Sequence, residues 1–334
     1  MRHKWLAMAV LGVVLAFGTV SWGEVTVTKV AHAGWKNCHR IANGKIDAIV
    51  TADVGPRVIR FGFVGGPNEF HQFPDQVGRT RSAAGGDEWR IYGGHRLWHA
   101  PEAMPRSYAP DNRPIEVRHE GAIVRCIQPV EQSTGIQKEI VLTMDPTEAR
   151  MRVTHRLTNR GLWPVRLAPW ALSVMETGGC AILPLPTTAP QGKLLPNARV
   201  ILWSYSDMAD PRFTWSAKYV LFRQDSEATS PGKVGIMATD GWGAYANRGH
   251  LFVKTFTFDP EGEYPDMGSS LEVYSASDFL ELETVAPLTM LGPGETVEHV
   301  EVWHLFDGVR FKPDPRTVDS VVLPLVKPLL SPTR

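Results

Sequence analysis

Several signatures of common enzyme classes are missing from this sequence. It contains no Gly-x-Ser-x-Gly elbow, no phosphate-binding loop, no dinucleotide fingerprint and no His-Glu-x-x-His zinc-protease motif. Their absence argues against serine hydrolases, nucleotide-dependent enzymes and zinc proteases of the common types. We therefore expect a protein that works without a cofactor.

A net charge and a long amphipathic helix are also absent. Lys+Arg and Asp+Glu are balanced at 35 each, so no overall field draws the chain to nucleic acid or to an anionic membrane. Hydrophobic residues make up 43% of the sequence and charged residues 21%, which excludes a disordered chain and supplies a substantial core. Without helix-period patterns, that core is expected to come from strands.

Cysteines are few: Cys38, Cys126 and Cys180. An odd count leaves at least one of them unpaired. The sequence leaves open whether the other two form a disulfide.

The N-terminus combines a charged start with a short apolar run. Arg2 and Lys4 precede apolar residues 6–20, and small residues follow, as in a secretory signal peptide. The run is shorter than the roughly 20 apolar residues of a membrane-spanning helix. We predict that residues 1–23 are removed and that the mature chain starts at Glu24. It would then work in the periplasm or outside the cell, with no membrane span.

Short runs of period-two alternation, bounded by Gly, Pro, Asn and Asp, dominate the rest of the chain. They lie at residues 25–30, 45–51, 58–64, 115–127, 137–144, 151–157, 199–205, 219–223, 251–258, 271–274, 279–285 and 297–305. A dozen strands without interleaved helices predict antiparallel sheets, too many for an immunoglobulin-sized sandwich. We predict one large all-β sandwich over residues 24–310. A proline-rich tail, 311–334, with one or two helical turns, should pack on its outside.

Residues 93–102 read Gly-Gly-His-Arg-Leu-Trp-His-Ala-Pro-Glu and combine two imidazoles, a guanidinium, an indole and a carboxylate. The glycine pair permits close backbone approach, and Pro101 disfavours a helix before it, so the segment is strand or loop. Its side chains offer the hydrogen bonding, stacking and acid/base groups that a sugar pocket needs. The alternative is a β-bulge with surface charges and a core tryptophan.

His95, His99 and Glu102 have the spacing of three metal ligands on one helical face. The flanking glycines and Pro101 oppose that helix. On a strand, Glu102 would point away from the two histidines. We therefore predict no metal site.

Alternation within residues 279–285 places Glu281 and Glu283 on one face and Leu280 and Leu282 on the other. The leucine face belongs to the core. The two carboxylates are either solvated or line a cleft, where neighbouring carboxylates raise one another's pKa.

Other charged residues could reach the same cleft. Lys254 lies on the strand face opposite Phe252 and Phe256, and the turn-like residues 263–266 lead to Glu272. Solvation at the tip of the side chain is the alternative for the lysine.

Among nine tryptophans after residue 23, most belong in the core. Trp98 and Trp242 are the best placed to stack on a sugar ring.

Segments 34–37, 55–59, 93–102, 251–254, 264–266 and 281–284, in this order, resemble a bacterial family of unknown function. That family looks like a branch of the galactose mutarotase (aldose 1-epimerase) superfamily. The resemblance covers nearly the whole mature chain, and 93–102 is its most specific part. It implies a β-supersandwich with a carbohydrate-binding cleft on one sheet.

The resemblance also implies roles for individual residues. Mutarotases open an aldose with a carboxylate base and a histidine that protonates the ring oxygen. Glu283, or Glu281 instead, matches the base, whereas His95 and Arg57 match sugar-binding positions. The acid histidine has no counterpart, because the matching residues 167–171 read Leu-Ala-Pro-Trp-Ala. His95 or Lys254 would have to supply that proton.

The expected site therefore has Glu283, His95 and Glu281 as catalytic residues. Its substrate-binding residues are expected to be Arg57, Arg96, Trp98, Glu102, Trp170, Lys254 and Glu272. Three functions remain open for a mono- or oligosaccharide ligand. They are an aldose 1-epimerase-like isomerase, a non-catalytic sugar-binding protein, and a polysaccharide lyase or glycoside hydrolase with paired carboxylates.

The signal peptide can be tested directly. We expect N-terminal sequencing of protein secreted by a bacterial host to begin at Glu24, because the charged start and apolar run end just before it. Exported protein that still begins at Met1 would contradict this.

Overall fold

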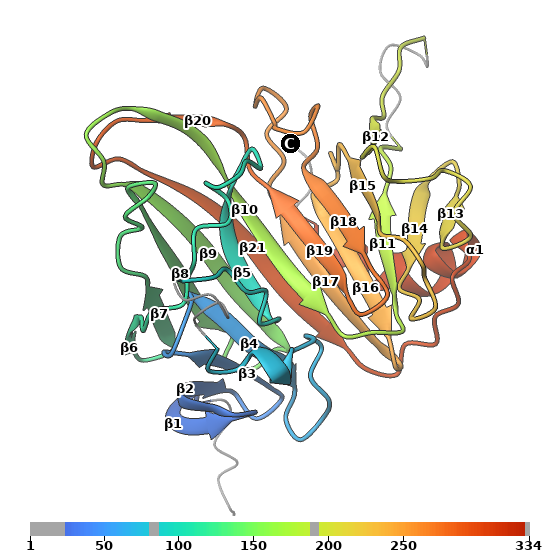
Figure 1. Ribbon diagram of the computed structural model, residues 1–334. Coiled ribbons are helices and arrows are strands. Elements are labelled where there is room, and N and C mark those ends of the chain that lie inside the picture. The colour runs from blue at the N-terminus through green and yellow to red at the C-terminus, as the bar shows by residue number, and fades with distance from the viewer. Residues whose placement is uncertain (1–23, 80–86, 188–193, 331–334) are drawn as a thin grey trace, which may run out of the picture.

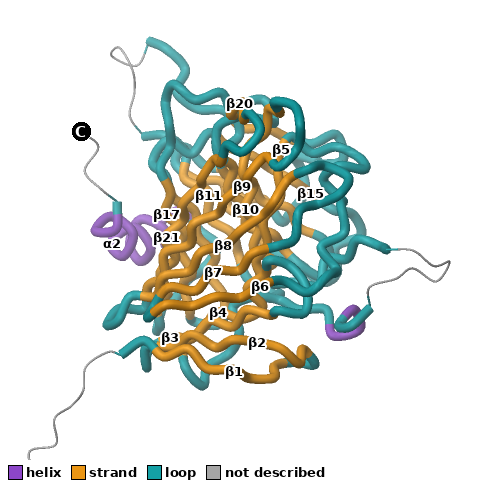
Figure 2. The backbone as a smooth tube through the Cα atoms, turned by 90° about the vertical axis from the view of Figure 1, so that its left-hand side faces the viewer, coloured by secondary structure: helices purple, strands orange, loops and turns teal. Residues whose placement is uncertain are grey.

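Two large antiparallel sheets lie face to face, with the hydrophobic core between them (Figure 1). The computed structural model describes residues 24–79, 87–187 and 194–330; the predicted signal peptide lies outside them. Figure 2 shows that strands form the body of the molecule and that the short helices lie at its periphery. The predicted all-β sandwich is confirmed.

The first sheet has eleven strands and carries the candidate site. Its strands are, in spatial order, β1 (Thr26–His32), β2 (Trp35–Ala42), β3 (Ile46–Thr51), β4 (Arg57–Phe63), β5 (His95–Ala100), β10 (Val165–Met175), β19 (Leu280–Val285), β18 (Leu271–Ser275), β15 (Gly232–Ile236) and β12 (Val200–Leu202), with β20 (Thr289–Leu291) paired to β10.

The second sheet has ten strands. They are, in spatial order, β13 (Phe213–Trp215), β14 (Tyr219–Arg223), β11 (Cys180–Pro184), β16 (Trp242–Asn247), β17 (His250–Phe256), β21 (Thr296–Phe306), β9 (Arg150–Asn159), β8 (Ile136–Met144), β7 (Ile123–Ile127) and β6 (Glu116–Glu120).

The core forms where the inner faces of the sheets meet. Leu280 and Leu282 of β19 point inward, as their alternation predicts, and are fully buried. From the second sheet, Phe252 and Trp303 pack edge to face with ring centroids 5.7 Å apart. Fully burying side chains of this size contributes roughly 1.5–3 kcal/mol each, so the alternating strands account for the two-layer fold.

Some strands give no alternating signal because both of their faces are covered. The last nine residues of β10, from Leu167 to Met175, are all buried, and so is the whole of β5. The predicted run 115–127 is two strands, β6 and β7, because Gly121 turns the chain between them with φ 54°.

The C-terminal segment covers the outer face of the second sheet. It is helical through α1 (Pro315–Thr317), η3 (Val318–Val322), α2 (Leu323–Val326) and η4 (Lys327–Leu329), longer than the expected turn or two. Val318, Val322 and Val326 are fully buried in one cluster with Trp242. Trp242 is therefore a core residue of the second sheet, and its predicted role in sugar stacking is wrong.

The three cysteines share one chemical state. Cys38, Cys126 and Cys180 are all buried as free thiols. Burial raises the pKa of Cys38 to about 11 and those of Cys126 and Cys180 to about 12, which keeps the three thiols protonated and unreactive. In the described part of the chain, no helix has the length and apolarity to cross a bilayer.

The packing of β19 gives a stability prediction. Leu282→Ala leaves a cavity between the sheets and should lower the free energy of unfolding by about 2–5 kcal/mol, measured by urea denaturation. The matched control is Leu162→Ala, because Leu162 is 84% exposed; it should change stability by less than about 0.5 kcal/mol. Equal effects of the two variants would contradict the placement of Leu282 in the core.

Candidate functional site

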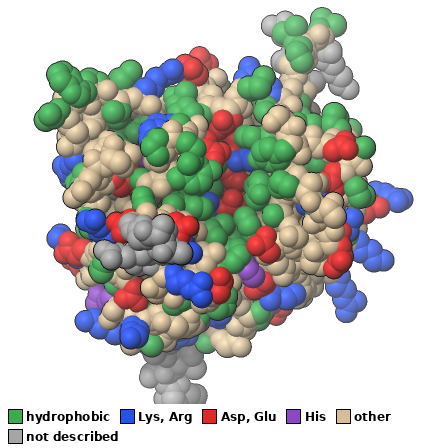
Figure 3. Space-filling view, viewed as in Figure 1, with side chains coloured by type: hydrophobic (Ala, Val, Ile, Leu, Met, Phe, Trp, Pro, Cys, Tyr) green, Lys and Arg blue, Asp and Glu red, His purple; other side chains and the backbone are tan. Residues whose placement is uncertain are grey.

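The outer face of the first sheet, turned away from the core, carries a row of charged side chains that Leu172 interrupts. Directly paired residues of antiparallel strands point to the same face. Leu172 pairs with Arg96 on one side and with Glu283 on the other, and Glu283 pairs with Glu272. Figure 3 shows charged side chains at the bottom of a hollow that hydrophobic side chains border.

A cavity of about 510 Å³ lies over this row. Strands β5, β10, β15, β18 and β19 form its floor, and the loops around β5, after β12 and before β19 form its walls. The lining residues are Trp89, Ile91, Arg96, Trp98, Glu102, Tyr108, Trp170, Trp203, Tyr205, Pro231, Lys233, Tyr274, Phe279, Glu281 and Glu283. Aromatic walls over a charged floor suit a polar, ring-shaped ligand.

Lys233 is the central cation of the floor. Its Nζ lies 2.8 Å from Oε2 of Glu272 and 3.0 Å from Oε2 of Glu283. The indole Nε1 of Trp170 also donates to Oε2 of Glu283, at 2.8 Å. Oε1 of Glu283 is buried and has no hydrogen-bond partner among the described residues, so it is free to meet a ligand.

These surroundings shift two protonation equilibria. Burial, together with the charges of Glu272 and Glu281, raises the pKa of Glu283 above its ordinary value, although Lys233 opposes the shift. Burial disfavours the charge of Lys233, but its two carboxylate partners outweigh burial and raise the pKa of Lys233 well above the ordinary range. The lysine therefore stays an ammonium ion, and Glu283 tends to keep a proton near neutral pH.

Glu281 has a different partner. The Nη1 atom of Arg96 donates to Oε1 of Glu281 at 2.6 Å, a charge-assisted bond between buried groups. The guanidinium of Arg96 also lies 4.7 Å from the ring centroid of Trp98. Trp98 is only 4% exposed, whereas Tyr205 at the rim is 44% exposed. The rim thus offers more free aromatic surface than Trp98 does.

His95 and Lys254 do not line the cavity. On β5 the alternation that turns Arg96 outward turns His95 inward, where it is fully buried between the sheets. Lys254 of β17 is also fully buried there and pairs with Glu301 at 2.9 Å. Neither residue that could have replaced the mutarotase histidine lies among the residues lining the cavity.

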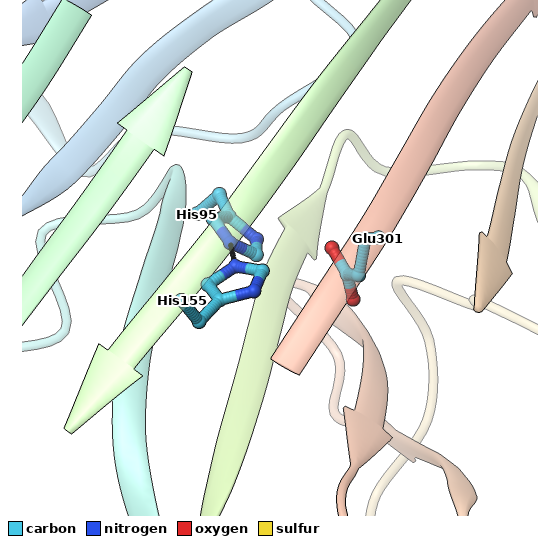
Figure 4. A group of neighbouring side chains, drawn as sticks. All are labelled: His95, His155 and Glu301. Atoms are coloured by element: carbon cyan, nitrogen blue, oxygen red, sulfur yellow. Dashed lines mark hydrogen bonds between the residues drawn. The ribbon is translucent and has the colours of Figure 1, made fainter. Parts of the chain in front are cut away.

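The inward-facing residues form a polar network inside the core (Figure 4). Nε2 of His95 lies 2.7 Å from Nε2 of His155, and Nδ1 of His155 donates to the carbonyl oxygen of His299 at 3.1 Å. Burial lowers the pKa of His95 well below its ordinary value and that of His155 to about 4. Both imidazoles are therefore neutral, with His95 donating to His155.

His95, His155 and Glu301 present possible ligand atoms within 4.8 Å of one another. Their donor set does not favour a metal ion, because these atoms already have partners. Glu301 accepts bonds from Lys254, at 2.9 Å, and from the indole of Trp303, at 2.6 Å. A metal cation would have to compete with the ammonium of Lys254 in the same buried space.

Two further expected residues lie at the edge of the site. Arg57 pairs with Arg96 in the sheet register and is fully buried. It donates to Asp111 at 2.8 Å and to the carbonyl oxygens of Ile91 and Gly93 at 2.7 and 2.8 Å, so it fixes the loop before β5. Glu102 lies exposed at the mouth, where the Tyr108 hydroxyl donates to it.

Of the site residues predicted from the sequence, six line this cavity and one lies directly beneath it. The six are Glu281, Glu283, Arg96, Trp98, Glu102 and Trp170, and Glu272 lies beneath. Lys233, Trp203 and Tyr205 were not predicted. The sequence signal for Lys233 was its position inside the otherwise apolar run Gly232–Ile236. All of these residues are buried, and a fully buried lysine needs a partner.

No protein-family model matches the sequence, and no curated protein matches it. Solved structures match the fold. A candidate aldose 1-epimerase from Klebsiella pneumoniae is 13% identical with a TM-score of 0.55, covering 87% of this chain and 83% of that one. A candidate mutarotase from Salmonella typhimurium is 8% identical with a TM-score of 0.54, covering 85% and 94%.

A TPR-domain containing protein from Parabacteroides distasonis is 13% identical with a TM-score of 0.55 over 88% of this chain. This chain spans 56% of that longer protein. At these identities the likeness is one of fold, and it agrees with the galactose mutarotase-like sandwich expected from the sequence.

Lys233 gives a pH-dependent stability prediction. Lys233→Met leaves two buried carboxylates unpaired and should cost about 3–5 kcal/mol of unfolding free energy near pH 8. A buried carboxyl whose folded pKa is raised above its unfolded value favours the folded state as pH falls, so part of the loss should be recovered at pH 5. Urea denaturation at both pH values measures this.

The control for this measurement is Lys218→Met. Lys218 pairs with Asp319 at 2.9 Å, but both side chains are largely exposed, so the loss should stay within about 1 kcal/mol. An equal loss for Lys233→Met at pH 5 and pH 8 would contradict the carboxylate pairing.

Proposed function

We propose that this protein binds a mono- or oligosaccharide in the cavity of the first sheet and acts on it by aldose 1-epimerase-like acid/base chemistry. One observation carries the proposal: Glu281 and Glu283 of one strand both line the cavity, in different electrostatic surroundings. Paired titratable groups whose environments differ in this way are typical acid/base assignments. The fold shared with candidate aldose 1-epimerases supports the sugar class.

The two environments suggest a role for each carboxyl group. Glu281, paired with Arg96, is suited to accept the proton of the anomeric hydroxyl. Glu283, whose raised pKa favours the protonated form, is suited to protonate the ring oxygen. This reverses the role that the family resemblance suggested for Glu283. Two residues apart on a strand, the groups are roughly 7 Å apart along the chain, a span comparable with a sugar ring.

The reaction then follows from these two transfers. As Glu281 takes the hydroxyl proton, the bond between the anomeric carbon and the ring oxygen breaks and a carbonyl forms. Glu283 gives its proton to the departing ring oxygen. Reclosure on either face of the carbonyl returns both protons and yields either anomer.

We also propose that the protein reaches the periplasm or the cell exterior before it meets its ligand. Basic residues followed by the short apolar run 6–20 support this.

A non-catalytic sugar-binding protein is the second candidate. It is favoured by the lack of histidines among the described residues that line the cavity. It is also favoured by the ion pairs that hold both carboxylates, because a group locked in an ion pair transfers a proton less readily.

Glu283→Gln separates the two candidates. Loss of the acidic group should reduce anomeric exchange, followed by NMR on common aldoses, by about 10²–10⁴-fold. Binding measured by calorimetry should persist, because the amide keeps the shape of the side chain. The control is Glu298→Gln, since Glu298 lies on the second sheet and pairs with Arg156 at the surface.

The outcomes are distinct. Wild-type exchange no faster than in buffer, together with clear sugar binding, would favour the binding protein. Absence of binding to any mono- or oligosaccharide by the wild type would overturn the proposal as a whole.

A further inference from the structure

The charged side chains that line the cavity of the first sheet do not balance. They are the carboxyl groups of Glu102, Glu281 and Glu283 and the cations of Arg96 and Lys233. Charges that share a concave space with little water are costly unless groups of opposite charge compensate them. A ligand that enters this cavity therefore meets an excess of negative charge.

Both cations of the cavity are already held by carboxylates. Arg96 donates to Glu281 at 2.6 Å. The ammonium of Lys233 lies 3.0 Å from Glu283 and 2.8 Å from Glu272, which lies beneath the floor. An anionic sugar, such as a uronic acid or a sugar phosphate, would have to compete with these carboxylates for the same two cations. The cavity therefore disfavours an anionic ligand.

Glu102 is the lining carboxylate that no cation holds. Within the described ranges of the chain it forms no ion pair, and its contact is with the hydroxyl of Tyr108, which donates to it. Arg106, the arginine next along the same loop, donates instead to the carbonyl oxygen of Pro101. Because Glu102 is exposed and lines the mouth of the cavity, a bound ligand can reach its carboxylate.

Tyrosine rings at the mouth also offer their faces to a cation. Tyr108, which is bonded to Glu102, packs edge to face against Trp89 with ring centroids 5.3 Å apart, and the exposed ring of Tyr205 lines the same cavity. The cations of the floor lie over indole rings, and in the described part of the chain none lies over either tyrosine. Because the face of a tyrosine ring attracts an ammonium group, the mouth combines a carboxylate with aromatic faces that suit an organic cation.

The floor supplies the other half of the recognition. Oε1 of Glu283 is buried and has no hydrogen-bond partner among the described residues, so it is left to bond with a ring oxygen or a hydroxyl group of a ligand. Glu283 at the floor and Glu102 at the mouth line one cavity of about 510 Å³, a size typical of small-molecule sites. A ligand that satisfies both carries ring oxygens at one end and a positive charge at the other.

We propose that the ligand is an amino sugar, bound with its protonated amine at Glu102 and its ring over Glu281 and Glu283. This inference rests on the proposed function and names the chemical class of the sugar. The anomeric carbon then lies at the floor, beside the two carboxyl groups assigned to proton transfer, and the amine lies toward the mouth. Glu102 is a binding residue that sets specificity, because it takes part in neither proton transfer.

The test compares sugars that differ only in charge. The probes are glucose, glucosamine and the two isomers of glucosamine that carry the amine at carbon three or carbon six, with calorimetry on the whole protein at about pH 6, where such amines are protonated. At least one amino sugar should bind about tenfold more tightly than glucose, the gain expected from one charge-assisted hydrogen bond. The N-acetylated form of that sugar, which has no charge, should lose the gain, and glucuronate should bind more weakly than glucose.

Glu102→Gln identifies the residue responsible. The amide keeps the length of the side chain and can still accept from Tyr108, but it offers no charge to the amine. The ratio of the glucose Kd to the amino-sugar Kd should therefore fall from about ten to about one. The matched control is Glu298→Gln, because Glu298 pairs with Arg156 on the second sheet, and it should keep the wild-type ratio.

Salt separates charge from shape. Screening weakens a contact between an ammonium group and a carboxylate at the mouth, so the ratio should shrink between about 20 mM and about 500 mM sodium chloride in the wild type. In Glu102→Gln the ratio should stay constant. A wild-type ratio that does not change with salt would show a preference for the shape of the amine and would overturn the inference.

The remaining outcomes distinguish this inference from the proposed function. Equal binding of glucose and all three amino sugars, or a preference that survives Glu102→Gln, would overturn the inference and leave a neutral sugar as the ligand of the proposed enzyme. Tighter binding of glucuronate than of glucose would also overturn it. Amino-sugar binding that depends on Glu102, without anomeric exchange above that in buffer, would support the inference and refute the proposed acid/base chemistry. Absence of binding to all of these sugars would overturn both.

Discussion

The ammonium group of Lys233 is the interaction on which the site depends. Three neighbouring strands, β15, β18 and β19, bring Lys233, Glu272 and Glu283 to one point, and without the cation two facing carboxylates would have to be protonated or separated. The same ammonium lies 4.7 Å from the ring centroid of Trp170 and 4.6 Å from that of Trp203. It therefore links the charged floor to the aromatic wall as well as the strands to one another.

Strand β19 is held from both sides. Outward, its carboxylates pair with Arg96 and Lys233. Inward, Lys254 donates to the carbonyl oxygen of Leu282 at 3.0 Å, and the Thr284 hydroxyl donates to Glu301 at 2.5 Å. The buried network behind the site thus fixes the backbone that positions the two carboxyl groups, which gives these core polar residues a role without contact with a ligand.

Period-two alternation predicted the structural features that neighbouring residues of the sequence determine, such as which face of a strand is buried. Alternation alone placed Leu282 in the core and Glu283 on the opposite face, because one face of β19 is apolar. It did not tell which face of β5 is the outer one, since His95 and Arg96 are both polar and both buried. That choice depends on pairing with β10, a strand about 70 residues away whose own apolar run has no period. Lys233 is likewise placed by the pairing of its strand β15 with β18, which follows much later in the sequence.

The cations over the indole rings limit how a ligand can bind in the cavity. Arg96 covers one face of Trp98, and Lys233 covers one face each of Trp170 and Trp203. A ligand entering this space therefore meets a polar floor and three indole rings that each already carry a cation, and the more exposed aromatic surface lies at the rim, on Tyr205. For the proposed sugar ligand, we expect recognition through directional bonds, whose thermodynamic signature is a large favourable heat of association offset by ordering. Under the proposed function, such a cavity would read the pattern of hydroxyl groups on a sugar ring more closely than the apolar faces of that ring.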